Sequence, residues 1–184
     1  MTPARCHRRT QGGALLIEVL VAMLLLSFGM LSLGAMMSFS VQMPKLSGYR
    51  STAVNLASSY IERIRANPAG FSAYEKPLHE KAWSFEKIER KDCQYPDCSE
   101  ALLADMDDAA IRQAVRDALP AGDLLVRCDT TPCNKDSHGN LWIVWQEPAT
   151  HEKLDTSSWD NCPIEADKIY TQPKPRCMYV GFQV

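Results

Sequence analysis

The sequence lacks the short patterns that usually mark an enzyme. It has no G-x-S-x-G nucleophile turn, no glycine-rich phosphate loop and no C-x-x-C redox pair. Beyond residue 13 the histidines are His79, His138 and His151, each in a polar or turn-like stretch with no nucleophile beside it. We therefore expect no enzymatic activity and no cofactor, although an active site assembled from distant residues would leave no such pattern.

Charge is nearly absent from one long segment, residues 12–41. Between residues 12 and 41 the only charged residue is Glu18, and about 20 apolar residues suffice to cross a membrane. The preceding residues carry Arg5, Arg8 and Arg9 and no acid, which predicts a cytoplasmic N-terminus and an outward-facing remainder. A cleaved secretory signal is one alternative, but its apolar region runs only ~7–15 residues. An uncleaved signal anchor is another.

Neither alternative explains Glu18. A charged side chain at the centre of a bilayer costs ~3 kcal/mol, so the carboxylate requires a partner or a place near a polar boundary. Residues 13–18, GALLIE, resemble the processing motif of type IV prepilins and type II secretion pseudopilins. The resemblance implies cleavage after Gly13 by a membrane peptidase and N-methylation of Ala14. Ala14 departs from the family, in which phenylalanine or methionine is commoner at this position.

The resemblance also implies a role for Glu18 in assembly. Cleavage creates a positive amino group at Ala14, which would attract the Glu18 carboxylate of a neighbouring subunit strongly in a helical bundle without water. Because an unpaired carboxylate there is costly, the pair favours one axial register between subunits. The alternative interpretation is an interfacial glutamate that reaches the lipid headgroups.

A long helix continues beyond the membrane segment. Apolar residues recur at three- and four-residue spacing from Leu46 to Ile64, and the pattern ends at Asn67-Pro68 because proline disfavours helix in the residue before it. The predicted helix, residues 14–66, is roughly 80 Å long at about 1.5 Å per residue. Pro44 should kink it, since proline removes a backbone hydrogen bond.

Two further segments resemble the PilV family of minor type IV pilins. They are YIERIRANP, residues 60–68, and residues 98–122. The resemblance implies an α+β fold, a long N-terminal spine helix packed on a small antiparallel β-sheet. It divides the chain into a leader (1–13), a transmembrane helix (14–43), a periplasmic half-helix (44–67) and a globular domain (68–184).

The globular part has three strand-like segments, residues 123–128, 140–147 and 176–184, rich in β-branched and aromatic residues. Residues 69–97 show no clean period, with a short strand possible at 82–88. Either Ser99 or Asp105 could cap a helix that ends before Pro120. We interpret the acidic cluster Asp105, Asp107 and Asp108 as a solvated helix start.

Seven cysteines are present, of which Cys6 lies in the leader. The other six would form disulfides in an oxidising compartment, and six cysteines allow 15 pairings. Proximity in sequence favours three pairs: Cys93–Cys98, Cys128–Cys133 and Cys162–Cys177. The alternative is zinc, because the first two pairs are C-x4-C and four thiolates can bind it. Zinc sites more often use C-x2-C, so we expect disulfides and no metal.

We do not expect the chain to bind nucleic acid. Without residues 1–13 the chain has 17 basic and 22 acidic residues, a net charge of −5, whereas phosphate binders present a basic surface. The resemblance instead implies other partners: minor pilins, the major pilin, the prepilin peptidase and the inner-membrane assembly platform.

A type II secretion pseudopilin is the nearest alternative to a minor pilin. A signal-anchored extracytoplasmic enzyme or zinc-binding domain is the alternative from another class.

Overall fold

The computed structural model describes residues 14–79, 87–89, 92–94, 96–147, 161–170 and 174–184. The chain divides into two compact units, residues 1–45 and 46–184, and each is described by itself. Part of the strand considered at 82–88 lies outside the described residues, and residues 87–89 form no strand.

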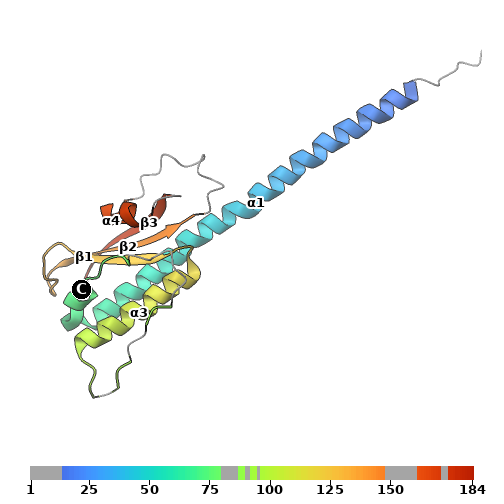
Figure 1. Ribbon diagram of the computed structural model, residues 1–184. Helices are drawn as coiled ribbons and strands as arrows, with labels where there is room; N and C mark the ends of the chain where they lie inside the picture. Colours follow the sequence, from blue (N-terminus) through green and yellow to red (C-terminus); the bar gives the residue numbers. More distant parts are fainter. Residues whose placement is uncertain (1–13, 80–86, 90–91, 95, 148–160, 171–173) are drawn as a thin grey trace, which may run out of the picture. The chain divides into compact units, whose positions relative to one another are not determined.

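One helix, α1 (Ala14–Ala66), accounts for the described part of the first unit and the start of the second (Figure 1). It ends at the residue that the sequence predicts, and it is already helical at Ala14, the first residue that the structure describes. Pro44 lies inside the helix, and the kink expected there stays a prediction. The end at Ala66 follows from Pro68, which opens a short 3₁₀ helix, η1 (Pro68–Gly70).

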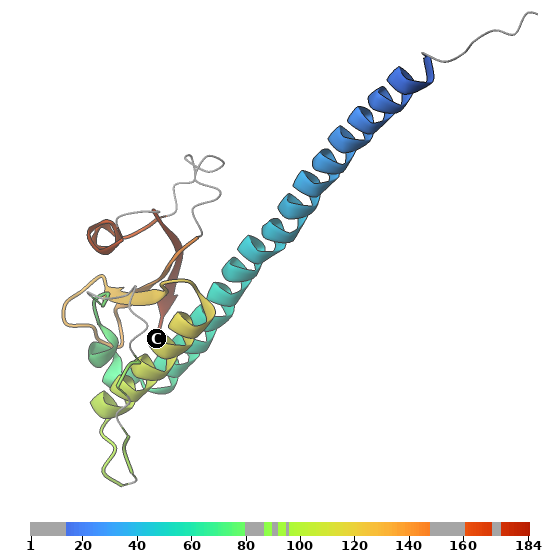
Figure 2. The same ribbon diagram turned by 45° about the vertical axis from the view of Figure 1, so that its right-hand side comes forward.

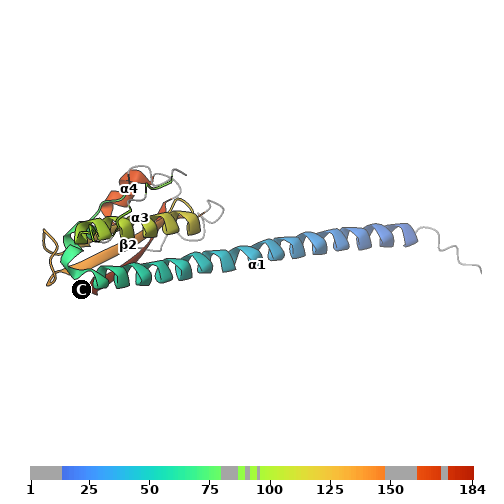
Figure 3. The same cartoon turned by 90° about the horizontal axis from the view of Figure 1, so that it is seen from below.

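The second unit is built in layers. The second half of α1 and helix α3 (Glu100–Ala118) lie side by side, as Figures 1 and 3 both show. A three-stranded antiparallel sheet of order β1-β2-β3 packs against them. Its strands are β1 (Asp123–Cys128), β2 (His138–Gln146) and β3 (Pro175–Gln183). The short helix α4 (Ile164–Ile169) lies on the far face of the sheet (Figure 2). The predicted α+β fold is confirmed.

The sheet is covered on both faces, which explains its nearly continuous apolar strands. Leu124, Val126 and Ile143 pack in the larger core with α1 and α3, where Tyr60, Ile64 and Trp145 are also buried. Leu125 and Val144 point the other way and pack against Ala166 and Tyr170 in the α4 layer. β1 has the predicted bounds, and β2 and β3 each begin slightly earlier than predicted.

Two short helices were not predicted. Helix α2 (Phe71–Tyr74) has only four residues, so it is too short to show a helical period. Helix α4 has six residues and begins directly after Pro163. Both bury aromatic or small side chains in the core, namely Phe71, Tyr74 and Ala166. Tertiary packing therefore determines these elements, because helices this short are unstable in isolation.

Candidate assembly site

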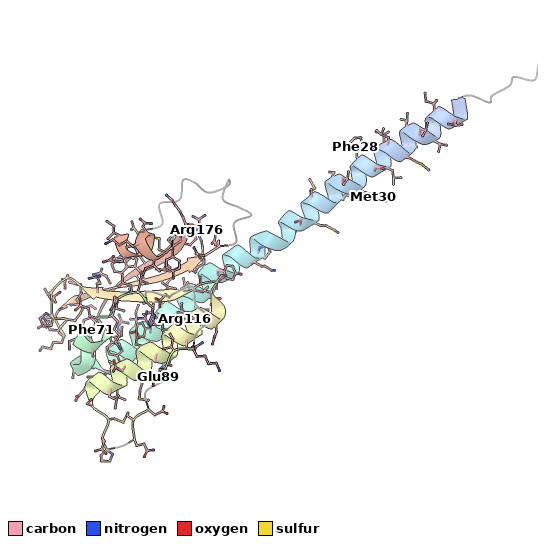
Figure 4. All side chains as sticks on the ribbon, viewed as in Figure 1. Phe28, Met30, Phe71, Glu89, Arg116 and Arg176 are labelled. Carbon is pink, nitrogen blue, oxygen red and sulfur yellow. A yellow bond between two sulfur atoms is a disulfide. The ribbon has the colours of Figure 1, made fainter. Side chains whose placement is uncertain are left out.

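The first part of α1 has the length and composition of a membrane span. The candidate span is Leu16–Ser38, 23 residues with a hydropathy of 2.4, and its most apolar window is 0% buried. The core helix of a soluble protein would bury such a window, whereas here side chains such as Phe28 and Met30 project from the helix into the surroundings (Figure 4). An apolar environment outside the chain is the simplest partner for this surface.

Glu18 is the third residue of this span, and its side chain is exposed. The next charged residue along α1 is Lys45, too far along the helix to reach it. Ala14, the first residue of α1, precedes Glu18 by four residues, so the two lie on the same helical face about 6 Å apart along the axis. Gly13 and the basic residues before it lie outside the described residues.

The second half of α1 is joined to α3 by polar contacts as well as by its core. The Arg63 guanidinium lies 2.8 Å from Asp107, and the Tyr74 hydroxyl donates to the other oxygen of that carboxylate at 2.8 Å. At the end of the spine, the Asn67 amide donates to the Glu100 carbonyl at 2.8 Å. The first half of α3 is therefore fixed to the end of α1 by charge and by hydrogen bonds.

A buried ion network lies deeper between these elements. Arg112 of α3 forms ion pairs with Asp108, at 3.1 Å, and with Asp123 of β1. The Tyr60 hydroxyl of α1 donates to Asp108 at 3.0 Å, and Arg112 also donates to the Leu124 carbonyl at 2.9 Å. Burial by itself lowers the pKa of Arg112, but the carboxylates of Asp123 and Asp108 outweigh it, so the pKa is raised. Arg112 is therefore a permanent cation that links α1, α3 and β1.

The interpretation of the acidic cluster as a solvated helix start is wrong. Ser99 caps α3, its hydroxyl accepting from the Leu102 amide, and the alternative cap at Asp105 is not used. All three aspartates lie beyond the first turn and are paired: Asp105 with Lys76, Asp107 with Arg63, and Asp108 with Arg112. Arg112 and Asp123 are not among the residues that the sequence patterns single out. The spacing of Asp108 and Arg112, four residues apart on a helix, was the available signal.

Buried tyrosines surround this network. Burial, followed by the negative charge of Asp108, raises the pKa of Tyr60 well above its usual value. Burial likewise raises the pKa of Tyr170, whose hydroxyl donates to the Ala121 carbonyl at 2.8 Å. Both hydroxyls therefore act as hydrogen-bond donors at neutral pH and have no acid–base role there.

The six cysteines that follow Cys6 form Cys93–Cys98, Cys128–Cys133 and Cys162–Cys177, the pairs that proximity favours. The four cysteines of the zinc alternative are thus joined in two disulfides. Among the described residues, no group of three or more potential metal-ligating side chains occurs. The third bridge joins Cys162, which directly precedes Pro163, to Cys177 of β3. Because α4 begins just after Pro163, this bridge holds α4 on the sheet.

Of the histidines, His79 donates its backbone amide to Asp123 and His138 donates its own to Asp129; His151 lies outside the described residues. Of the tryptophans, Trp145 is in the core and Trp142 stacks at a tilt on Tyr179. The two histidines thus make these hydrogen bonds with their backbone amides, and the two tryptophans contribute packing.

Comparison with known proteins agrees with this arrangement. Residues 35–109 match the family model described as Tt1218-like, type IV pilin Tt1218. The match covers the second half of α1 and the start of α3, less than half of the chain, and does not reach residues 13–18. No curated protein and no solved structure matches the chain. Residues 35–109 are thus similar to a type IV pilin family, and the α+β architecture is consistent with the type IV pilin fold.

Proposed function

We propose that this chain is a minor pilin that helps to initiate type IV pilus assembly. In this proposal a prepilin peptidase cleaves after Gly13, the new N-terminus at Ala14 is methylated, and the subunit joins other minor pilins near the pilus tip. Before assembly it is a single-pass inner-membrane protein with its C-terminal domain in the periplasm. A pilin match favours a structural role over an enzymatic one.

The observation that carries the proposal is the position of Glu18. It is the fifth residue counted from Ala14 and lies in an apolar segment that has no second charge. In an isolated processed subunit, the α-amino group of Ala14 lies one helical turn away and can partly neutralise the carboxylate. In a bundle, the Ala14 amino group of a neighbour would replace it and fix the register.

The junction between α1 and α3 supports a spine role for α1. Arg63 and Tyr60 contact α3 from the last turns of α1, and Asn67 does so from the residue after its end. A force or displacement applied to the spine is therefore transmitted to α3 and the sheet, as an assembling subunit requires.

Substitution of Glu18 tests the assembly role. We expect Glu18→Gln to accumulate in membranes like the wild type but to decrease in sheared pili by about tenfold or more, because a charge-assisted pair contributes ~1.5–3 kcal/mol. Glu62→Gln is the matched control, since Glu62 is an exposed glutamate of the same helix outside the span. Equal recovery of both variants in the pilus fraction would contradict the role of Glu18.

Deletion phenotypes separate the alternatives. A minor pilin is required for twitching motility, whereas a pseudopilin is required for exoprotein release. If both processes are normal and the purified chain binds stoichiometric zinc, the anchored zinc-binding domain is the better account.

A further inference from the structure

The outer face of the sheet, on which α4 lies, is only partly covered (Figure 2). Leu125 and Val144 are buried on this face and pack with α4. Towards β3 the same face carries Trp142 of β2, which is partly buried, and Tyr179 of β3, which is 44% exposed. A pair of aromatic side chains therefore remains open to solvent beside the α4 layer.

The Tyr179 ring is held in place by three neighbours. It lies directly opposite Trp142 in the β2–β3 register, with the ring centroids 5.1 Å apart and the rings tilted by 40°. Its hydroxyl donates to the side-chain oxygen of Asn140 at 2.7 Å. Gly181 leaves room for this hydroxyl, because a Cβ at that position would lie only 3.2 Å from it. The exposed ring is thus preorganised, and a ligand that stacks on it would not have to order it first.

The polar groups beside the ring carry no net charge. Asn140 uses its oxygen to accept from Tyr179, while its amide nitrogen has no protein partner among the described residues and can donate to a ligand. Arg127, which is paired with Asn140 in the β1–β2 register, forms an ion pair with Glu165 at 2.7 Å. The two charges next to Asn140 therefore cancel, so this face favours neither an anion nor a cation.

The size of the exposed surface argues against a protein as the occupant. A large aromatic side chain has about 150–250 Å² of surface, so Tyr179, at 44% exposure, and the partly buried Trp142 together offer ~200 Å². A specific protein interface takes ~800 Å² from each partner. A second copy of this chain or another polypeptide would therefore find too little apolar surface at this pair, whereas a small ligand would not.

A pyranose sugar has the matching chemistry. One face of its ring consists of C–H groups and is similar in size to a phenol ring, and its rim carries neutral hydroxyl groups. The positively polarised C–H groups can stack on the electron-rich face of Tyr179, while a sugar hydroxyl accepts from the Asn140 amide. Small-molecule sites commonly combine an apolar surface with a few placed polar groups in this way.

We propose that Tyr179, Trp142 and Asn140 form a binding platform for a neutral pyranose unit of a glycan. The sugar stacks on the exposed Tyr179 ring, Trp142 supports that ring, and the Asn140 amide donates to a sugar hydroxyl. This inference rests on the outer face of the sheet alone and is independent of the proposed pilus role.

The test is a titration of the full chain with maltose, cellobiose and lactose, in micelles of a detergent that has no sugar headgroup. The NMR signals of the Trp142 indole N–H, the Asn140 side-chain amide and the Tyr179 backbone amide report on the platform. With at least one disaccharide we expect saturable shifts confined to this face, with a Kd of about 1 mM or tighter. Saturation of the Tyr179 ring protons should also transfer to the C–H protons of the bound sugar.

Variants separate stacking from an effect on folding. Tyr179→Ala should weaken binding at least about tenfold because it removes the ring, whereas Tyr179→Phe keeps the ring and should bind within about threefold of the wild type. Gly181→Val keeps every contacting group, but its side chain crowds the Tyr179 hydroxyl, so the displaced ring should bind at least about threefold more weakly. Leu103→Ala is the matched control, since Leu103 is 39% exposed but lies on α3, and it should bind like the wild type.

Four results would overturn the proposal. The first is the absence of saturable shifts at this face with all three disaccharides at about 20 mM, well above the expected Kd. The second is binding by Tyr179→Ala, or by Gly181→Val if the first variant does not fold, that equals binding by the wild type. The third is an equally tight response to cyclohexanol, whose apolar ring has a single hydroxyl, because the face would then not select a sugar. The fourth is a change in the same signals with protein concentration in the absence of sugar, which would identify a second copy as the occupant.

Discussion

Replacing Arg112 by methionine should destabilise the second unit strongly. The Arg112 side chain is 4% exposed and pairs with Asp108 and Asp123, which are 9% and 0% exposed. Methionine fills similar space but leaves Asp123 and the Leu124 carbonyl without their cation, while Asp108 keeps only a longer contact to Lys76 at 3.8 Å. Removal of one partner from a buried ion pair costs ~3–5 kcal/mol, so we expect the free energy of unfolding to fall by that amount at pH 7.

Urea unfolding of the full chain in micelles, followed by tryptophan fluorescence, measures this loss. Arg127→Met is the control, because Arg127 of β1 forms an exposed pair with Glu165 at 2.7 Å and should lose at most ~1 kcal/mol. The defect of Arg112→Met should shrink as the pH falls, since an unpaired buried carboxylate can take up a proton. Equal losses in the two variants, or a defect that does not change with pH, would refute the reasoning.

Three other predictions concern the same unit. Tyr60 and Tyr170 should still be protonated at a pH where exposed tyrosines titrate, as measured by absorbance near 295 nm; because their pKa values are raised in the folded state, stability should fall as the pH rises above about 10. Cys162→Ser with Cys177→Ser opens a loop with a sequence separation of 15 and should cost ~3 kcal/mol of unfolding free energy, against ~2 kcal/mol for either shorter bridge. Gly70→Ala would place a Cβ 2.6 Å from the Glu100 backbone oxygen, so the midpoint of thermal unfolding should fall, whereas an unchanged midpoint would show that this contact can relax.

The long helix and the sheet were predictable because their signals are local. The period from Leu46 to Ile64 and the proline at Pro68 determine where α1 runs and ends. The runs LLV and LWIVW identify strands, and their lack of alternation follows from a sheet with both faces covered.

The ion network was not predictable to the same degree. Asp108 and Arg112 are close in sequence, but the third member, Asp123, joins them only because β1 packs beside α3. Residue type alone does not distinguish a solvated aspartate from a buried one. Tertiary placement, not local propensity, determined the role of the acidic cluster, and the same applies to α4.

The most direct test of the proposed function is the N-terminus of the protein extracted from membranes, measured by intact mass and N-terminal sequencing with and without the prepilin peptidase. The proposal predicts a chain that begins at Ala14, with or without a methyl group, only when the peptidase is present. A chain that keeps Met1 or its arginine-rich leader in both cases would contradict processing after Gly13 and, with it, the proposed role of Glu18 in assembly.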